Sequence, residues 1–317
     1  MSTRNLKRVF EPRSIALIGG DRDPRSIAYT VAGNLFHSGF KGPVIPVHDT
    51  LQAVRGALAC RSVEDLPVVP DLAVIASPAE SVPALIDSLG ARGTKAAVVL
   101  SPEFDRAGAE SGRQLRQAIL DAAKPHVLRI VGPACLGVLV PRHGLNASYA
   151  HVGATPGDLA FVAQSASVTG LLLDWAAPRA VGFSLVASLG DMADVDFGDM
   201  LDYVAIDART RAVLLYIESI DEVRKFMSAA RTVSRIKPVI VFKAGAGATA
   251  SPMALNDGGR VDAGDVYEAA FRRAGMLPVD TVNELIAAAQ TLARGTRTAG
   301  DRLAIVCNGR GIGTMAA

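Results

Sequence analysis

Residues 14–21 read SIALIGGD, a short apolar run that ends in two glycines and an aspartate, and a helix is expected after Pro24. A continuous apolar strand followed by a glycine turn and a helix is typical of a parallel α/β domain, whose strands are buried on both faces. Backbone N–H groups in such a turn can approach a phosphate at the helix N-terminus. The motif is not a complete G-x-G-x-x-G, because Arg22, Asp23 and Pro24 fill its later positions. A tight turn without a ligand is therefore the alternative interpretation.

The same alternation of strands and helices continues along the chain. The expected strands are residues 14–19, 43–47, 71–77, 95–101 and 127–132, then 159–164, 183–189, 212–218 and 238–243. Amphipathic segments of helical period separate most of them, which predicts a parallel sheet covered on both faces. We expect two doubly wound α/β domains, residues 1–150 and 151–298, and the truncated start of a third α/β unit at residues 299–317.

Composition narrows the class of protein. The chain has 317 residues, of which 50% are apolar and 20% charged, with a net charge of +2 and 5% aromatic residues. This excludes a disordered chain and argues against a general nucleic-acid binder, which needs a positive surplus and rings for stacking. Three distant cysteines argue against a disulfide framework or a zinc site. No apolar run approaches about 18 residues, so no membrane span is expected. Together with the cysteine and charge content, this favours a cytoplasmic protein that binds neither membrane nor nucleic acid.

A dinucleotide-binding domain usually carries an acidic residue at the end of its second strand. Here that strand ends in PVIPVHD, so Asp49 would have to fill this place. The glycine turn and Asp49 indicate a nucleotide-type ligand without selecting the nucleotide. Binding of NAD by a dehydrogenase-like domain therefore remains open.

Further motifs occur in a defined order from about Leu6 to Ala317. They are FEPRSIALIGG, GFKGPVIPV, PDLAVIASPAE, GPACLGV, GLNASYA, GDLAFVAQSASV, ASLGDMADVDFGDMLDYVAID, LLYIESI and KPVIVFKAG. Together they resemble the CoA-binding and succinyl-CoA-ligase-like domains of ADP-forming acyl-CoA synthetases. The resemblance implies a Rossmann-like CoA-binding domain, then a flavodoxin-like domain, with CoA or acetyl-CoA as the ligand.

The resemblance also implies which residues bind CoA. The glycine turn would hold the CoA phosphates, and two strand ends would border the adenine and the pantetheine. These cofactor-binding residues are Gly19, Gly20, Asp21, Val47, Ser77 and Pro78. Gln164 and Ser165 open a helix in the second domain, where Ser165 would donate to a phosphate or carboxylate. A helix N-cap is the equally weighted alternative for Ser165.

The family passes a phosphoryl group through a histidine, which is nucleophilic at neutral pH. In the family this histidine shortly precedes a helix that matches GDVY here, and counting back from Tyr267 places Asn256 at its position. An amide nitrogen is neither basic nor nucleophilic, so Asn256 cannot form a phospho-intermediate. All five histidines lie at or before His151. Glu218 matches the residue that orients the histidine, and no catalytic residue is predicted.

With an asparagine in place of the histidine, the chain resembles one subgroup of the family, the bacterial protein lysine acetyltransferases that fuse this region to a GNAT domain. The resemblance implies a degenerate regulatory region that binds a CoA thioester and acts on a GNAT domain, with possible homo-oligomerisation. The GNAT and ATP-grasp-like domains would lie outside these residues. The alternative is an ADP-forming acyl-CoA synthetase α-like region that works with an ATP-grasp partner.

Two other features have structural explanations that we favour. The aspartates at positions 191, 194, 196, 199 and 202 lack the spacing of an EF-hand, so we expect helix capping and a solvated face rather than metal binding. Cys135 is expected to be a buried small hydrophobe rather than a reactive thiol.

Overall fold

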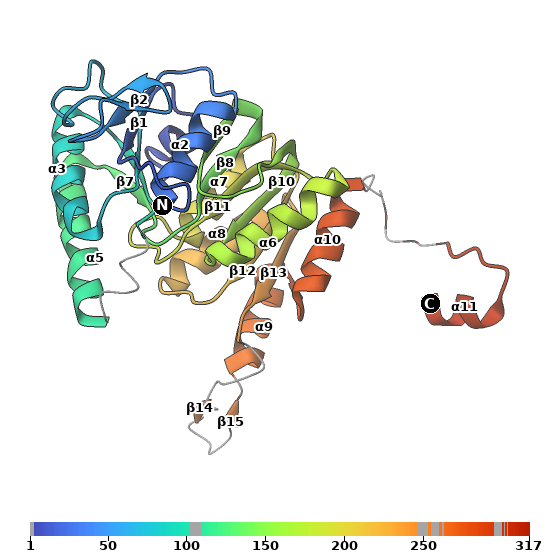
Figure 1. Ribbon diagram of the computed structural model, residues 1–317. Helices are drawn as coiled ribbons and strands as arrows, with labels where there is room; N and C mark the ends of the chain where they lie inside the picture. The colour runs from blue at the N-terminus through green and yellow to red at the C-terminus, as the bar shows by residue number, and fades with distance from the viewer. Residues whose placement is uncertain are drawn as a thin grey trace.

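The computed structural model describes residues 3–101, 109–245, 253–254, 260–261, 263–294, 300, 302 and 304–317. Two largely parallel sheets, each with helices on both faces, make up the body of the molecule (Figure 1). The structure therefore confirms the α/β class and the two doubly wound units that the alternation of apolar runs predicted.

The first sheet has five parallel strands in the order β2-β1-β5-β6-β7. They are β1 (Ile15–Ile18), β2 (Val44–Val47), β5 (Leu72–Ile75), β6 (Ala96–Val99) and β7 (Arg129–Val131). The helices are α1 (Leu6–Phe10), α2 (Ile27–His37), α3 (Val82–Arg92) and α5 (Ala109–Ala123). Residues of α3 and α5 pack on one face and residues of α1 and α2 on the other. Because β1, β5 and β6 are buried along their whole length, their sequences show no polar alternation.

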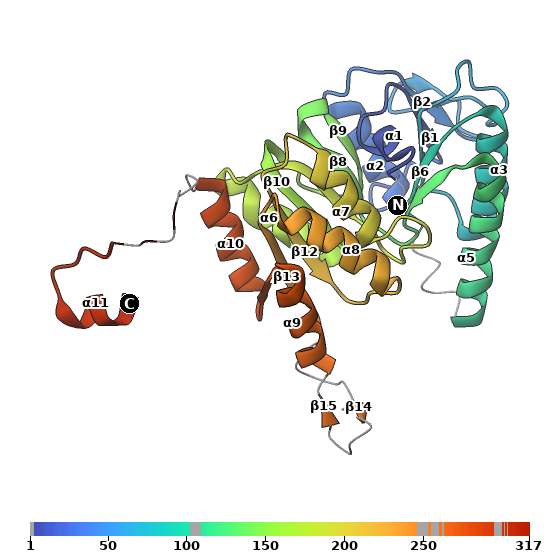
Figure 2. The ribbon, with the colours of Figure 1, turned by 180° about the vertical axis from the view of Figure 1, so that it is seen from behind.

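The second sheet has seven strands in the order β16-β13-β12-β10-β11-β8-β9. They are β8 (Gly137–Val140), β9 (Leu145–Ser148), β10 (Thr155–Ala163), β11 (Gly182–Ser188), β12 (Ala212–Ile217), β13 (Val239–Lys243) and β16 (Leu277–Val279). The helices are α6 (Ala166–Ala176), α7 (Phe197–Ile206), α8 (Val223–Ser234), α9 (Ala263–Ala274) and α10 (Val282–Arg294). Figures 1 and 2 show α6 and α10 on one face, with α7, α8 and α9 on the other.

The division of the chain between the sheets differs from the expected boundary at residue 150. Strand β8 pairs antiparallel with β11, and β9 pairs antiparallel with β8, so both strands belong to the second sheet. The chain therefore passes from the first sheet to the second between Val131 and Gly137. The apolar sequence of β8 specifies a buried strand, but only the tertiary fold specifies its partner.

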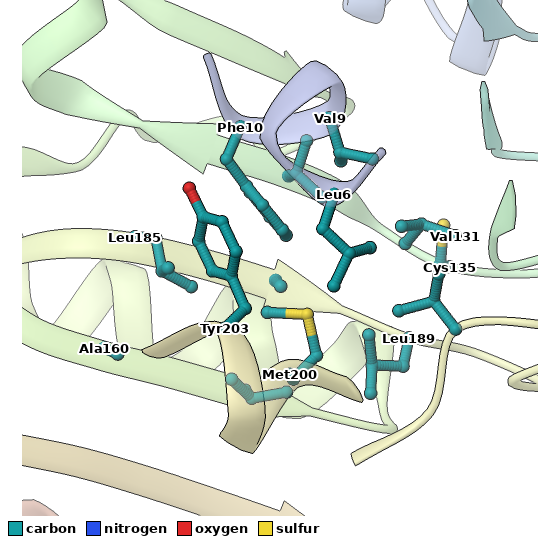
Figure 3. Close-up of a cluster of buried hydrophobic side chains, with 14 of the residues drawn as sticks. Leu6, Val9, Phe10, Val131, Cys135, Ala160, Leu185, Leu189, Met200 and Tyr203 are labelled. Carbon is teal, nitrogen blue, oxygen red and sulfur yellow. The ribbon is translucent and has the colours of Figure 1, made fainter. Parts of the chain in front are cut away.

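The two sheets share one apolar core. Helix α1 from the start of the chain packs against α7 of the second unit, and the Phe10 and Tyr203 ring centroids lie 4.8 Å apart. Figure 3 shows these rings beside Leu6, Met200 and Leu185. Burial of large side chains stabilises by roughly 1.5–3 kcal/mol each, so this contact fixes the two units relative to each other.

Shorter elements complete the described chain. They are β3 (Ala53–Val54) with β4 (Ala57–Leu58), β14 (Met253–Ala254) with β15 (Arg260–Val261), and α11 (Arg310–Ala316). Within the segment expected to begin a third α/β unit, residues 304–309 form no strand, and α11 lies apart from both sheets (Figures 1 and 2). Within the described ranges, no helix has both the length and the apolar character that crossing a bilayer requires.

Candidate functional site

A cavity of about 520 Å³ opens at the carboxyl ends of β1, β2 and β5. Strands β2 and β5 lie on opposite sides of β1, so the direction of chain progression reverses at this point, where open α/β sheets bind their ligands. Five of the residues implied to bind CoA line this one cavity: Gly19, Gly20, Val47, Ser77 and Pro78.

The two glycines of the turn are required by contacts within the chain itself. Gly19 has a φ of +111°, and a Cβ there would approach the carbonyl oxygen of Ala76 to 2.7 Å. A Cβ on Gly20 would lie 2.9 Å from Val54 and 3.2 Å from His48. These contacts explain both glycines as turn-forming residues, and they also bring the backbone of the turn to the cavity wall.

Asp21 forms hydrogen bonds within its own turn. Its Oδ1 accepts hydrogen bonds from the backbone N–H groups of Arg22 at 2.6 Å and Asp23 at 3.0 Å. These bonds, together with one from Ser26, hold the pKa of Asp21 below its ordinary value of 3.8. The carboxylate therefore occupies two amides that the turn would otherwise offer to a phosphate. Asp21 is absent from the cavity wall and competes with an external anion at these amides.

The end of β2 forms the opposite wall of the cavity. His48 Nε2 donates to the Gly20 carbonyl oxygen at 3.2 Å, and Nδ1 accepts from the N–H groups of Thr50 and Leu51, each at 3.1 Å. This hydrogen-bond pattern assigns the tautomer with its proton on Nε2. An Asp49 carboxylate oxygen lies 3.0 Å from Nδ1.

Sequence reasoning missed Arg61, which also lines the cavity. Its Nη1 donates to the backbone oxygen of Asp49 at 2.5 Å. The segment before it returns alongside β2, because Cys60 forms a parallel bridge with Val47. No local motif in the sequence signals this return.

The predicted positions in the second unit lie together, but they have internal partners. Gln164 Oε1 accepts from the N–H groups of Glu218 and Ser219, both at 2.9 Å, and Nε2 donates to Ser219 Oγ at 2.9 Å. Ser165 Oγ accepts from Val168 N–H at 3.4 Å as the N-cap of α6. Neither Gln164 nor Ser165 lines the cavity of the first unit. Ser165 thus has the N-cap role that was one of its two interpretations, and the cofactor contacts of Gln164 and Ser165 stay a prediction.

Glu218, which the resemblance implies to be the histidine-orienting residue, lies close to Lys243 at the ends of β12 and β13. Glu218 follows β12, its side chain is exposed, and Lys243 pairs in register with the preceding Ile217. Burial lowers the pKa of Lys243, and the charge of Glu218 opposes that shift. Asn256 lies outside the described residues.

The aspartate run forms ion pairs and a helix cap. Asp196 and Asp199 make a reciprocal capping box at the start of α7. Arg129 of β7 donates to Asp194 and Asp199, both at 2.8 Å, and Lys225 of α8 reaches Asp199 at 2.7 Å. Burial alone would lower the pKa of Arg129, but the two aspartates raise it. No cluster of possible metal ligands occurs among the described residues.

Cys135 is fully buried, and burial raises the pKa of its thiol to about 12. A thiol with such a pKa is almost entirely protonated at neutral pH and is a poor nucleophile. The interpretation of Cys135 as a small hydrophobe is confirmed.

Comparison with known proteins agrees with this architecture. Residues 13–141 match the CoA binding domain family, and residues 156–292 match the succinyl-CoA ligase like flavodoxin domain family. The α subunit of ADP-forming acetate–CoA ligase I from Pyrococcus furiosus is 34% identical, over 98% of this chain and 68% of that protein. The chain belongs to the ADP-forming acyl-CoA synthetase family.

Other members of this family cover the chain equally well. ADP-forming acetate–CoA ligase I from Archaeoglobus fulgidus is 36% identical, over 98% of this chain but 45% of that protein. The apo structure of the dinucleotide forming acetyl-coenzyme A synthetase 1 of Ca. Korarchaeum cryptofilum superimposes with a TM-score of 0.88 at 32% identity. That match covers 98% of this chain and 67% of the synthetase chain. The chain thus spans only part of these family members.

Membership of the ADP-forming acyl-CoA synthetase family confirms the CoA-binding and ligase-like domains that the motifs predicted. These matches are to ligases and synthetases, and they give no support to the acetyltransferase subgroup. The predicted link to a GNAT domain stays a hypothesis.

Proposed function

We propose that this chain is the CoA-binding, α-like region of an ADP-forming acyl-CoA synthetase assembly, and that CoA or acetyl-CoA binds in the cavity at the carboxyl edge of the first sheet. One observation carries the proposal: Gly19, Gly20, Val47, Ser77 and Pro78, which lie in three separate segments, line a single cavity at the reversal point of the sheet.

The character of the cavity suits such a ligand. Its volume of about 520 Å³ falls in the range of small-molecule sites. Ile18, Val47 and Pro78 offer apolar walls for a flat ring, and Ser77 and Arg61 add polar groups at the rim. CoA would supply the thiol that accepts an acyl group, while the residues of this chain bind and orient it.

The fate of the phosphoryl group separates two versions of the proposal. The ligase relatives favour an α-like region that works with an ATP-grasp partner. Asn256 favours a regulatory region that has lost the phosphohistidine step, as in the hypothesised acetyltransferase fusion, because its amide cannot carry a phosphoryl group. Retention of CoA or acetyl-CoA binding is common to both versions.

Calorimetric titration tests ligand binding. We expect saturable binding of CoA and acetyl-CoA, and weaker or no binding of NAD and ADP. Ala84→Trp places a large ring in the cavity from an exposed position of α3, so it should weaken CoA binding by about tenfold or more. Ala91→Trp lies on the same helix, is equally exposed and does not line the cavity, so it serves as the matched control. Binding of NAD alone, or equal effects of both variants, would contradict the proposal.

Incubation with an ATP-grasp partner and ATP tests the phosphoryl step. The regulatory version predicts no acid-labile phosphoprotein from the native chain. An acid-labile phosphate on this chain would instead favour a working α-like region.

A further inference from the structure

Arg61 lines the cavity, and one hydrogen bond connects its side chain to the rest of the described chain. Arg61 lies at the carboxyl end of β2, on a segment that is fixed by its backbone. Cys60 N–H donates to the Pro46 oxygen at 2.9 Å, and His48 N–H donates to the Cys60 oxygen at 2.9 Å. The Arg61 side chain therefore starts from a rigid place beside the second strand.

The guanidinium of Arg61 is only partly used within the chain. It has five N–H donors, and Nη1 donates one hydrogen bond to the backbone oxygen of Asp49. Among the residues that the structure describes, the Arg61 side chain has no other hydrogen-bond or ion-pair partner, and it lines the cavity. This single bond orients the planar group and leaves further donors for a ligand.

The location of Arg61 indicates what that ligand group is. In dinucleotide-binding doubly wound sheets the ribose lies at the end of the second strand, where an acidic residue binds its 2′-hydroxyl and a nearby arginine accommodates a 2′-phosphate. The Asp49 side chain is 84% exposed, and its backbone oxygen, not its carboxylate, contacts Arg61. Arg61 therefore adds a phosphate-binding group at the end of β2, beside the Asp49 carboxylate that also lines the cavity.

We propose that Arg61 binds the 3′-phosphate on the ribose of CoA, so that the cavity selects 3′-phosphorylated adenine ligands over their dephosphorylated forms. This inference rests on the proposed binding of CoA. A planar guanidinium suits a phosphate because two parallel N–H groups can meet two phosphate oxygens.

Nearby carboxylates limit the size of the effect. Asp49 and Glu64 also line the cavity, and their negative charges oppose a phosphate. Hydrogen bonds from its own N–H and from Ser62 keep the pKa of Glu64 below its ordinary value, so this carboxylate is ionised at neutral pH. A charge-assisted hydrogen bond at an exposed, partly opposed site is expected to change affinity by about tenfold, the lower end of the usual range.

Calorimetry with CoA and dephospho-CoA at low ionic strength tests the proposal. We expect the native chain to bind CoA about tenfold more tightly than dephospho-CoA. Arg61→Gln should reduce this ratio to near one by weakening CoA alone and leaving dephospho-CoA unchanged. Arg55→Gln is the matched control, because Arg55 lies 3.7 Å over the Tyr29 ring and does not line the cavity. It should retain the ratio of the native chain.

The possible results separate this inference from the proposed function. Equal affinities of the native chain for CoA and dephospho-CoA would overturn the role of Arg61 and leave CoA binding intact. Equal weakening of both ligands by Arg61→Gln would do the same, because it indicates a general effect on the cavity. If neither ligand binds the native chain, the proposed function itself fails, and this inference fails with it.

Discussion

Replacement of Arg129 by methionine should be costly, because this side chain joins the two units by buried charges. The Arg129 side chain is 8% exposed and lies 2.8 Å from both Asp194 and Asp199. The Asp199 side chain is fully buried and also receives Lys225 at 2.7 Å. Arg129→Met keeps most of the apolar stem and removes the positive charge from this network.

The expected magnitude follows from the charges left behind. Removal of one partner from a buried ion pair typically costs about 3–5 kcal/mol, because the remaining charge is uncompensated. Asp199 would keep Lys225, and Asp194 is 26% exposed, so we expect the lower end, about 3 kcal/mol. This is a large part of a typical unfolding free energy of about 5–15 kcal/mol.

Urea unfolding followed by circular dichroism measures this loss. With a slope of about 3 kcal/mol/M, the unfolding midpoint should fall by about 1 M. Arg272→Met is the control, since Arg272 pairs with Glu268 at 2.8 Å on α9 with side chains 65% and 46% exposed. That exposed pair should change stability by at most about 0.5 kcal/mol. If Arg129→Met shifted the midpoint no more than Arg272→Met, the reasoning about buried charge would be refuted.

Three further outcomes follow from individual groups. Burial alone would raise the pKa of Asp207, but hydrogen bonds from Arg209 and Thr210 hold it below its ordinary value of 3.8. The stability that Asp207 adds is complete above that unfolded-state pKa and is lost as the pH falls through the lower native pKa. Asp207→Asn should therefore make the urea midpoint fall less steeply at acid pH when it is measured from about pH 2 to 7. An unchanged fall would contradict this. Asp21→Asn removes the charge that competes at the turn amides, so calorimetry should show tighter CoA binding, and weaker binding would mean that the carboxylate assists the ligand. In a chain whose exposed Cys307 and half-buried Cys60 are replaced by serine, the Cys135 thiol should stay unreactive toward a disulfide reagent at about pH 8 until urea unfolds the chain. Rapid labelling of Cys135 in the native state would refute its burial.

The strands were predictable because burial on both faces produces a strong local signal. Strand β1 lies within the apolar run at residues 14–19, and β12 lies within the run at residues 212–218. The partners of a strand are not encoded in that way. Strand β8 is as apolar as β1, but it joins the second sheet through antiparallel pairing with β11. Residue 150 therefore looked like a boundary, although the change of sheets occurs before β8.

The candidate site was predictable only where local sequence specifies geometry. Val47 and Ser77 follow from strand ends, because the carboxyl ends of parallel strands meet at one edge of a sheet. Arg61 could not be found, since its place depends on the return of residue 60 alongside β2. The hydrogen bonds of the Asp21 carboxylate could have been predicted, because aspartates commonly accept hydrogen bonds from backbone N–H groups one or two residues further along the chain. The hydrogen bonds of Gln164 could not be predicted, because its amide connects the ends of β10 and β12, which are far apart in the sequence.

The two sites implied by the family depend on different parts of this chain. The cavity is built by the ends of β1, β2 and β5 with the loop that carries Arg61, and all of these belong to the first sheet or its connections. Glu218 and Lys243 follow or end strands of the second sheet. The resemblance implies that Asn256 stands in place of the phosphohistidine, and the described residues that line the cavity all belong to the first unit. The shared core around Phe10 and Tyr203 keeps both units in one arrangement, so the hypothesis that phosphoryl chemistry has been lost is compatible with the proposed CoA site.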